Sequence, residues 1–257
     1  MVSICVIGCG NMGGALLNGL DDAGYTDLIA CDVDATVLDS FEQKGIKTTT
    51  DTSAARSVDI VVLAVKPDLV SVVLSDLELG SDQTLVSIAA GIGTEQIEPL
   101  TDATVIRLMP NLAAEWGLMA GAVAGGTIDD RLISALESLG EVVIVDESMM
   151  DIATALNGSG PAFVFYFINA MAESGIERGL RPETARILAA QTFKGAAETV
   201  LQSEETIEEL IEAVCSPKGT TIEGMEVLKR EDVAADITEA VFAAEQRATE
   251  LASEADL

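Results

Sequence analysis

The chain has 257 residues, of which 49% are hydrophobic, so it can build a core and is not a predominantly disordered polypeptide. Its 43 acidic residues against 14 lysines and arginines give a formal net charge of −29, which argues against nucleic acid or an anionic membrane surface as a partner. There is no His, which excludes imidazole bases and His-containing metal sites.

The acidic residues are dispersed along the chain, and only six lysines accompany them. This pattern predicts a solvated acidic surface whose self-repulsion is screened by salt, over about 3 Å at 1 M. We therefore expect a halophilic protein from a cytoplasm with molar salt. The alternative is an acidic protein without a salt requirement.

The four cysteines form no Cys-x-x-Cys pair, and no His is present to complete a zinc site. We expect free, buried thiols in a reducing cytoplasm and no bound metal. The first eight residues lack the basic and long apolar regions of a signal peptide. No apolar run approaches the roughly 20 residues that a membrane span needs.

Up to residue 147, short apolar runs alternate with helical patterns, which predicts a parallel sheet with both faces covered. We therefore expect an α/β, Rossmann-like doubly wound domain over residues 1–147. The predicted strands are Val2–Ile7, Leu28–Cys31, Ile60–Val65, Thr84–Ala89, Thr104–Met109 and Val142–Val145. The predicted helices are Met12–Ala23, Ala35–Lys44, Leu69–Leu77 and Asp130–Leu139.

Residues 148–257 show no strand pattern and predict an all-helical domain. Pro161 and Pro182 suit the first turn of a helix, and Ser203, Thr206 and Glu209 offer capping side chains. The predicted helices are Gly160–Arg178, Pro182–Gln202, Glu204–Val214, Lys218–Arg230 and Glu231–Ala252.

Within the first of these helices, the segment Pro161–Ala172 is apolar on nearly every face, and such a helix must be buried all round. A domain of about 110 residues can hardly enclose such a helix alone, so we expect a homodimer formed through the helical domain. The alternative is a central helix enclosed within one subunit.

A G-x-G-x-x-G motif follows the first predicted strand and opens a helix. In the sequence Ile7-Gly8-Cys9-Gly10-Asn11-Met12-Gly13, the glycines allow a tight turn, a close approach of the backbone to a pyrophosphate, and packing of helix on strand. This context predicts a dinucleotide site. A βα turn without a ligand is the alternative.

Asp32 follows the second strand, 19 residues after Gly13, near the spacing of the carboxylate that binds a ribose 2′-hydroxyl. A 2′-phosphate there would meet a like charge, so the sequence favours NADH over NADPH. Alternatively, Asp32 or Asp34 caps the next helix. Other strand ends should line the same crevice, and they carry the cofactor candidates Ala64, Val65, Lys66, Pro67, Ala89 and Ala90.

A second group of motifs lies in the helical half. Asn157-Gly-Ser-Gly-Pro-Ala precedes the apolar helix, and Cys-Ser-Pro-Lys-Gly-Thr-Thr-Ile-Glu, at residues 215–223, supplies hydroxyls and backbone N–H groups at a helix start. Such a helix start binds a small carboxylate, or is simply a capped end.

Together with Gly-Cys-Gly-Asn-Met-Gly, Ala-Val-Lys-Pro, Ser-Ile-Ala-Ala-Gly and Met-Pro-Asn, these motifs resemble pyrroline-5-carboxylate reductase over roughly residues 2–250. The resemblance implies reduction of 1-pyrroline-5-carboxylate to L-proline by hydride transfer from NADPH or NADH. It also implies interlocked homodimers, often assembled into decamers.

The resemblance further implies roles for single residues. Thr221 matches the threonine that hydrogen-bonds the substrate ring nitrogen, and we expect it to be catalytic. The remaining expected substrate-binding residues are Ser216, Gly219, Thr220 and Glu204.

Three residues depart from the family pattern. Lys218 stands where a glycine is usual. It would be strained if the position needs positive φ, and if not, its ammonium group would attract the anionic substrate through the field of the −29 charge. Asn157 replaces a usual serine, and Asp32 puts the usual NADPH preference in doubt. The alternative functions are reduction of another cyclic imine and a non-catalytic dinucleotide-binding regulator.

Overall fold

The computed structural model describes residues 2–254, so Met1 and residues 255–257 of the predicted domains lie outside it. The chain forms two compact units, Met1–Ser159 with Phe242–Leu257, and Gly160–Val241. This division differs from the predicted boundary at 147/148. The difference arises because Met150 is fully buried in a small cluster with Met109, Ala122 and Ala124 of the sheet.

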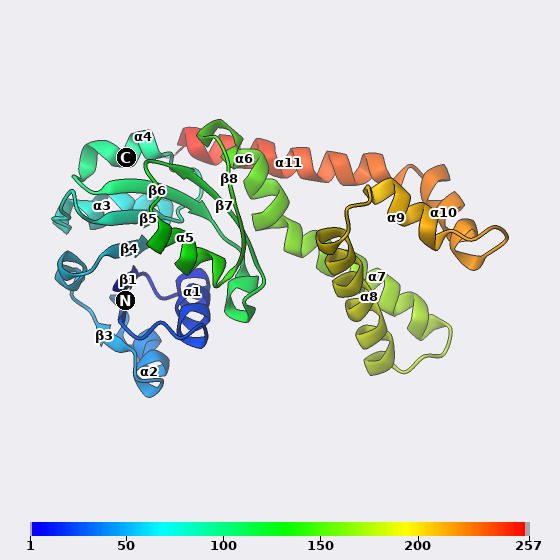
Figure 1. Ribbon diagram of the computed structural model, residues 1–257, viewed down its shortest axis with the longest axis horizontal. Helices are drawn as coiled ribbons and strands as arrows, with labels where there is room; N and C mark the ends of the chain where they lie inside the picture. Colours follow the sequence, from blue (N-terminus) through cyan, green and yellow to red (C-terminus); the bar gives the residue numbers. More distant parts are fainter. Residues whose placement is uncertain (1, 255–257) are drawn as a thin grey trace. The chain divides into compact units, whose positions relative to one another are not determined.

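The first unit contains an eight-stranded sheet in the order β3-β2-β1-β4-β5-β6-β7-β8 (Figure 1). Every neighbouring pair is parallel except β6 and β7, which are antiparallel. The strands are β1 Ile4–Ile7, β2 Leu28–Cys31, β3 Lys47–Thr49, β4 Ile60–Leu63, β5 Thr84–Ser87, β6 Thr104–Met109, β7 Met119–Gly125 and β8 Gly140–Ile144.

The sheet confirms the predicted α/β class, and six of its strands were expected. The sequence analysis missed β3, with three residues, and β7, which is built mainly of Ala and Gly. β3 is too short to show an alternating pattern, and β7 contains a single β-branched residue, Val123, which is too few to mark a strand in sequence.

Two apolar cores cover the two faces of the sheet, as the doubly wound pattern predicts. One face packs against α1 Asn11–Asp22, α2 Ala35–Gln43 and α5 Asp130–Glu137. The other packs against α3 Val70–Asp76 and α4 Thr94–Ile97. Successive strand residues alternate between these cores: Val6 belongs to the first, and Ile7 to the second.

Short 3-10 segments connect several of these elements. They are η1 Thr52–Ser57, η2 Pro67–Leu69, η3 Glu98–Leu100, η4 Leu112–Trp116 and η5 Glu147–Met149.

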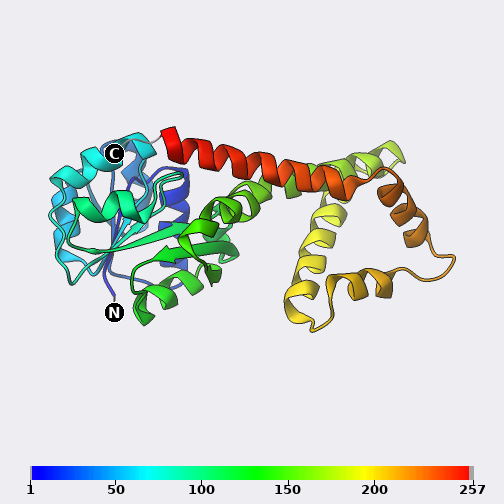
Figure 2. The ribbon, with the colours of Figure 1, turned by 90° about the horizontal axis from the view of Figure 1, so that it is seen from above.

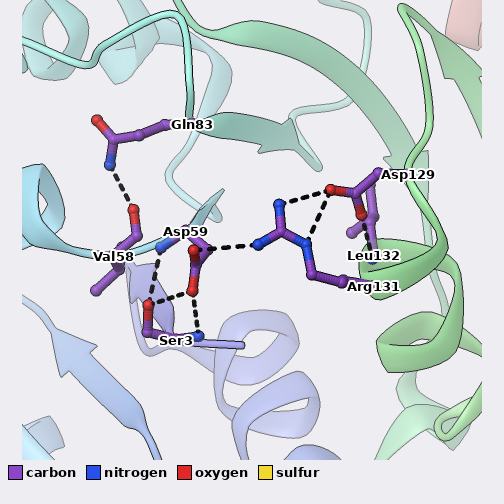
Figure 3. Close-up of polar contacts among 7 residues, drawn as sticks. All are labelled: Ser3, Val58, Asp59, Gln83, Asp129, Arg131 and Leu132. Carbon is purple, nitrogen blue, oxygen red and sulfur yellow. Dashed lines mark hydrogen bonds and ion pairs between the residues drawn. The ribbon is translucent and has the colours of Figure 1, made fainter. Parts of the chain in front are cut away.

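An ion-pair cluster fastens α5 to the sheet at the amino ends of the strands (Figure 3). Arg131 donates to Asp59 at 3.2 Å and to Asp129 at 2.9 Å, while Asp129 caps α5 by accepting from Leu132 N at 2.8 Å. Asp59 also accepts from the backbone and hydroxyl of Ser3 at 2.8 and 2.7 Å. These bonds, chiefly that from the Ser3 backbone, lower the pKa of Asp59. The cluster is a structural support at the amino-terminal edge of the sheet.

The second unit is helical, as expected, with α7 Gly160–Glu177, α8 Pro182–Gln202, α9 Ile207–Val214 and α10 Thr220–Arg230. A helix of 22 residues, α11 Val233–Glu254, is uninterrupted (Figure 2) and contributes its residues from Phe242 onward to the first unit. Among the described residues, no helix is long and apolar enough to cross a membrane.

Local sequence signals fix the starts of two of these helices. Thr206 and Glu209 form a reciprocal capping box, in which Glu209 accepts from Thr206 N at 2.8 Å and Thr206 Oγ1 accepts from Glu209 N at 3.3 Å. The box starts α9 at Ile207 rather than at the predicted Glu204. Pro182 occupies the first turn of α8, as predicted.

Pro161, by contrast, does not begin a separate helix. A short helix, α6 Met150–Ala153, leads through a π-helical turn, η6 Thr154–Ser159, directly into α7. A proline ring inside an α-helix clashes with the preceding turn, and the wider π turn accommodates it.

The apolar helix α7 is not enclosed within its own unit. Ala172 is its one buried residue, whereas Phe165 and Tyr166 are 66% and 73% exposed. The second unit therefore leaves uncovered the aromatic surface that a partner subunit would bury.

Candidate active site

The carboxyl ends of four parallel strands meet at one edge of the sheet. In the register, Ile7 pairs with Cys31 and with Leu63, and Leu63 pairs with Ser87. This edge holds the turn of strand order between β1 and β4, where open α/β sheets bind ligands. It brings together all the predicted cofactor residues: Ile7, Gly8, Gly10, Asn11, Met12, Gly13, Asp32, Ala64, Val65, Lys66, Pro67, Ala89 and Ala90.

Two glycines of the loop are required by packing within the protein. Gly8 has φ +92°, and a Cβ there would lie 2.6 Å from the carbonyl oxygen of Ala64. A Cβ on Gly13 would overlap the carbonyl oxygen of Gly8. The tight turn and the close contact of α1 with β1 thus depend on both residues.

Gly10 differs, because a Cβ at this position would meet no atom within 4 Å. Gly10 is also the N-cap of α1, and no side chain accepts from the first-turn N–H groups. These N–H groups, together with the open space beside the backbone, fit the pyrophosphate of a dinucleotide.

The carboxylate of Asp32 is bound to the glycine loop. Its Oδ2 accepts from Cys9 N at 2.7 Å, and its Oδ1 accepts from Asp34 N at 2.9 Å. Asp34, not Asp32, caps α2, accepting from Thr36 N at 3.0 Å. The capping alternative therefore applies to Asp34 alone, and a negative charge lies at the end of β2 beside the loop.

The residues that follow β4 and β5, next to the glycine loop, include small side chains and a conformationally restricted proline. Lys66 is exposed and precedes Pro67, which opens the η2 turn. After β5, Ala89 is buried, and its N–H donates to the Ser87 hydroxyl at 3.3 Å.

Three thiols lie beneath this edge. Burial raises the pKa of Cys5 and of Cys9 to about 12, and that of Cys31 to about 11. These thiols are protonated and unreactive at neutral pH, while Cys215 in the second unit is half-buried. Among residues 2–254, no group of Cys, Asp and Glu is arranged to hold a metal ion.

A charge network that was not predicted from the sequence surrounds the buried Arg107 and supports the sheet. Arg107 of β6 has a side chain only 6% exposed and donates to Glu147 at 2.9 Å, with Asp151 at 3.9 Å. Asp151 accepts from Thr249 of α11 at 2.8 Å, which ties the end of that helix to the first unit. The available signal was a lone arginine inside an apolar strand, because such a residue requires carboxylate partners.

Asn157, one of the three residues that depart from the family pattern, joins the π turn to the sheet. Its side-chain Nδ2 donates to Met109 O at 2.6 Å and Ala120 O at 2.7 Å, and its main-chain carbonyl oxygen accepts from Asn111 Nδ2 at 3.1 Å. Asn157 therefore holds the ends of β6 and β7 against the helical segment that follows.

The substrate candidates lie in the second unit. The segment Ser216–Gly219 is a β-turn, closed by a 2.9 Å hydrogen bond from Gly219 N to Ser216 O. Gly219 is the N-cap of α10 and provides no side-chain cap, so the N–H groups of Thr220 and Thr221 begin the helix uncapped. Thr221 is half-buried, and Glu204 is exposed in the connection before α9.

Lys218 has φ +63° and occupies the third position of that turn, after Pro217. A turn with proline second and positive φ third is of type II, which favours glycine at the third position. A lysine there costs about 1 kcal/mol or more relative to glycine. The strain foreseen for Lys218 is therefore present.

Comparisons with known proteins agree with both halves of this description. A family model for pyrroline-5-carboxylate reductase dimerisation matches residues 147–251, and one described as NADP oxidoreductase, coenzyme F420-dependent, matches residues 3–91. The pyrroline-5-carboxylate reductase of Methanosarcina acetivorans is 40% identical over 95% of this chain and 96% of its own length.

Two solved structures are similar over nearly their whole length. A pyrroline-5-carboxylate reductase from Coxiella burnetii has a TM-score of 0.88 and 33% identity, over 97% of this chain and 98% of that one. The Plasmodium falciparum pyrroline carboxylate reductase, solved with NADP bound, has a TM-score of 0.85 and 27% identity, covering 98% of each chain.

Proposed function

This chain belongs to the pyrroline-5-carboxylate reductase family. We propose that the site residues of its first unit bind the cofactor and that those of its second unit bind the substrate. The enzyme reduces 1-pyrroline-5-carboxylate to L-proline with NAD(P)H, the final step of proline biosynthesis. It forms a homodimer through its helical region.

The sheet edge around the glycine loop is the proposed cofactor site. The observation that carries this assignment is the open space at Gly10, beside the uncapped N-terminus of α1. The first-turn N–H groups would bind the pyrophosphate, and Ala64–Pro67 with Ala89 and Ala90 would border the nicotinamide half. The bound reduced nicotinamide supplies the hydride that the protein itself cannot provide.

The proposed substrate site is the loop Ser216–Thr221, in a helical domain that we assign to residues 148–257. The N–H groups at the start of α10, with the hydroxyls of Ser216 and Thr220, bind the substrate carboxylate. The Thr221 hydroxyl orients the ring nitrogen and passes to it a proton taken from solvent, so that the imine is protonated before the hydride arrives. Glu204 is the acidic residue that we assign to this site. A protonated imine is already electrophilic, so orientation is the main requirement and no histidine is needed.

A pair of variants tests this site. Thr221→Val removes the hydroxyl and keeps the shape, and we expect kcat to fall about 10- to 100-fold. Thr221→Ser keeps the hydroxyl and should retain most of the activity. Equal turnover by Thr221→Val and the wild type would contradict the assignment.

We further propose that the enzyme prefers NADH. The supporting contact is the 2.7 Å hydrogen bond from Cys9 N to Asp32, which holds a carboxylate against the loop that is to bind the dinucleotide. A 2′-phosphate near this charge would be disfavoured by about 1 kcal/mol or more after solvent screening, roughly a fivefold to tenfold preference.

The test compares kcat/KM for NADH and NADPH in Asp32→Asn and Asp34→Asn. Asparagine at residue 32 keeps an acceptor for Cys9 N and removes the charge, so the preference for NADH should fall by the same factor. Asp34→Asn removes a neighbouring charge and leaves a good N-cap, so it should not change the ratio. A wild-type preference for NADPH would contradict the proposal.

The proposal also covers the location of the enzyme in the cell and its assembly beyond the dimer. We place the enzyme in the cytoplasm, because its thiols are free and three of them are buried in reduced form. We also propose that dimers assemble further, as the family resemblance implies. Light scattering with size-exclusion chromatography measures the assembly, and a mass of two chains at all concentrations would contradict it.

A further inference from the structure

The strained turn before α10 carries a positive charge that glycine, the residue best suited to its backbone, would not provide. Lys218 lies at φ +63° in the third position of a turn whose second residue is Pro217. Strain of this kind persists where the side chain has a use that outweighs it.

Lys218 is isolated in a strongly acidic part of the second unit. Between residues 195 and 228 it is the single cationic residue. The same stretch contains eight carboxylates: Glu198, Glu204, Glu205, Glu208, Glu209, Glu212, Glu223 and Glu226.

The ammonium group of Lys218 forms no ion pair with any of these carboxylates. Its side chain is exposed, and within residues 2–254 it makes no ion pair or hydrogen bond. Lys47, for comparison, pairs with Asp27 at 3.0 Å. A cation with no partner in the protein remains available to an anion from solution.

We propose that Lys218 is a specificity-determining residue that draws the substrate carboxylate to the Ser216–Thr221 loop against the negative field of the chain. This inference rests on the proposed placement of the substrate in that loop. Net charge of −29 repels an anionic substrate, and a cation on the loop itself offsets the repulsion where the carboxylate must bind. The turn holds Lys218 two residues before Thr220, at the start of α10.

Three variants separate charge from backbone strain. Lys218→Gln removes the charge and keeps the strain, Lys218→Gly removes both, and Lys218→Arg keeps both. At the lowest ionic strength at which circular dichroism shows the wild type folded, Lys218→Gln and Lys218→Gly should raise KM for pyrroline-5-carboxylate about 3- to 10-fold. Lys218→Arg should stay within about twofold of the wild type, and the effect should fall on KM more than on kcat.

Salt and substrate charge provide the controls. The difference between Lys218→Gln and the wild type should shrink as KCl rises to 1 M but stay above unity, because screening over about 3 Å weakens long-range attraction more than a direct contact between ammonium and carboxylate. The imine 1-pyrroline has no carboxylate, so its kcat/KM should be the same in Lys218→Gln and in the wild type at every KCl concentration. The comparison of the two substrates can therefore be made at any salt concentration at which the protein is folded. Lys218→Gly should melt about 2–4 °C higher than the wild type, because it relaxes the turn.

The outcome also distinguishes this inference from the proposed function. If Thr221→Val loses turnover and Lys218→Gln keeps the wild-type KM for pyrroline-5-carboxylate, the loop binds substrate and the role of Lys218 is refuted. If neither variant changes the kinetics, the substrate lies elsewhere and the proposed site itself fails. An equal KM increase for pyrroline-5-carboxylate and 1-pyrroline would also refute a role in recognising the carboxylate.

Discussion

Replacing Gly10 by Ser should separate cofactor binding from folding. A Cβ at residue 10 meets no protein atom within 4 Å, and the backbone angles, φ −68° and ψ −157°, are extended and accessible to Ser. Ser is a preferred N-cap, and its hydroxyl can accept from first-turn N–H groups that now lack a side-chain partner. We expect the free energy of unfolding to stay within about 0.5 kcal/mol of the wild type, or to rise.

The same side chain would occupy the space in which the backbone is to approach a pyrophosphate. Loss of one hydrogen bond to a charged group costs about 1.5–3 kcal/mol, so the Kd for NADH should rise about 10- to 100-fold. Fluorescence titration of NADH measures the Kd, and thermal unfolding without cofactor measures the stability.

Gly13→Ala is the contrasting variant, because its Cβ would overlap the carbonyl oxygen of Gly8 and should impair stability and binding together. Wild-type affinity in a folded Gly10→Ser protein would show that the loop is a plain βα turn. Marked destabilisation of Gly10→Ser would instead refute the packing argument.

Three further predictions concern stability. Arg107→Ala leaves Glu147 and Asp151 without their buried partner and should lower the free energy of unfolding by about 2 kcal/mol, since the two carboxylates keep some contact with solvent. Urea unfolding measures the change, and a loss below about 1 kcal/mol would show that water replaces the arginine. The pKa values of Cys5 and Cys9 are raised to about 12 and that of Cys31 to about 11, so their contribution is complete below pH 9 and is lost as the pH rises toward 11–12. The free energy of unfolding should therefore fall between pH 9 and 11, and a Cys5→Ala, Cys9→Ala, Cys31→Ala variant with an equally steep alkaline loss would contradict this. The dispersed charge of −29 predicts a melting temperature that rises with KCl toward the molar range, whereas highest stability in dilute buffer would contradict a halophilic adaptation.

Local sequence determined the features that depend on neighbouring residues. A four-residue apolar run followed by Gly-x-Gly-x-x-Gly specifies β1, the turn and α1, because Gly8 takes a positive φ and Gly13 packs against the Gly8 carbonyl five residues before it. Thr206 and Glu209 mark the start of α9 for the same reason, since a capping box is closed within three residues. The motifs in their order were enough to identify the family.

The tertiary structure decided the features that depend on residues far apart in the chain. Arg107 finds Glu147 forty residues away, and β7 forms from Ala and Gly because β6 and β8 pair with it on both sides. Asp32 is 23 residues from Cys9, and only the parallel register of β1 and β2 brings its carboxylate to the loop. The spacing after Gly13 predicted that Asp32 would lie near a bound dinucleotide, but it did not predict the hydrogen bond from Cys9 N to Asp32. The periodicity of apolar residues predicts which face of a helix or strand is buried. Which residues pack against that face depends on how the strands are arranged in the folded sheet.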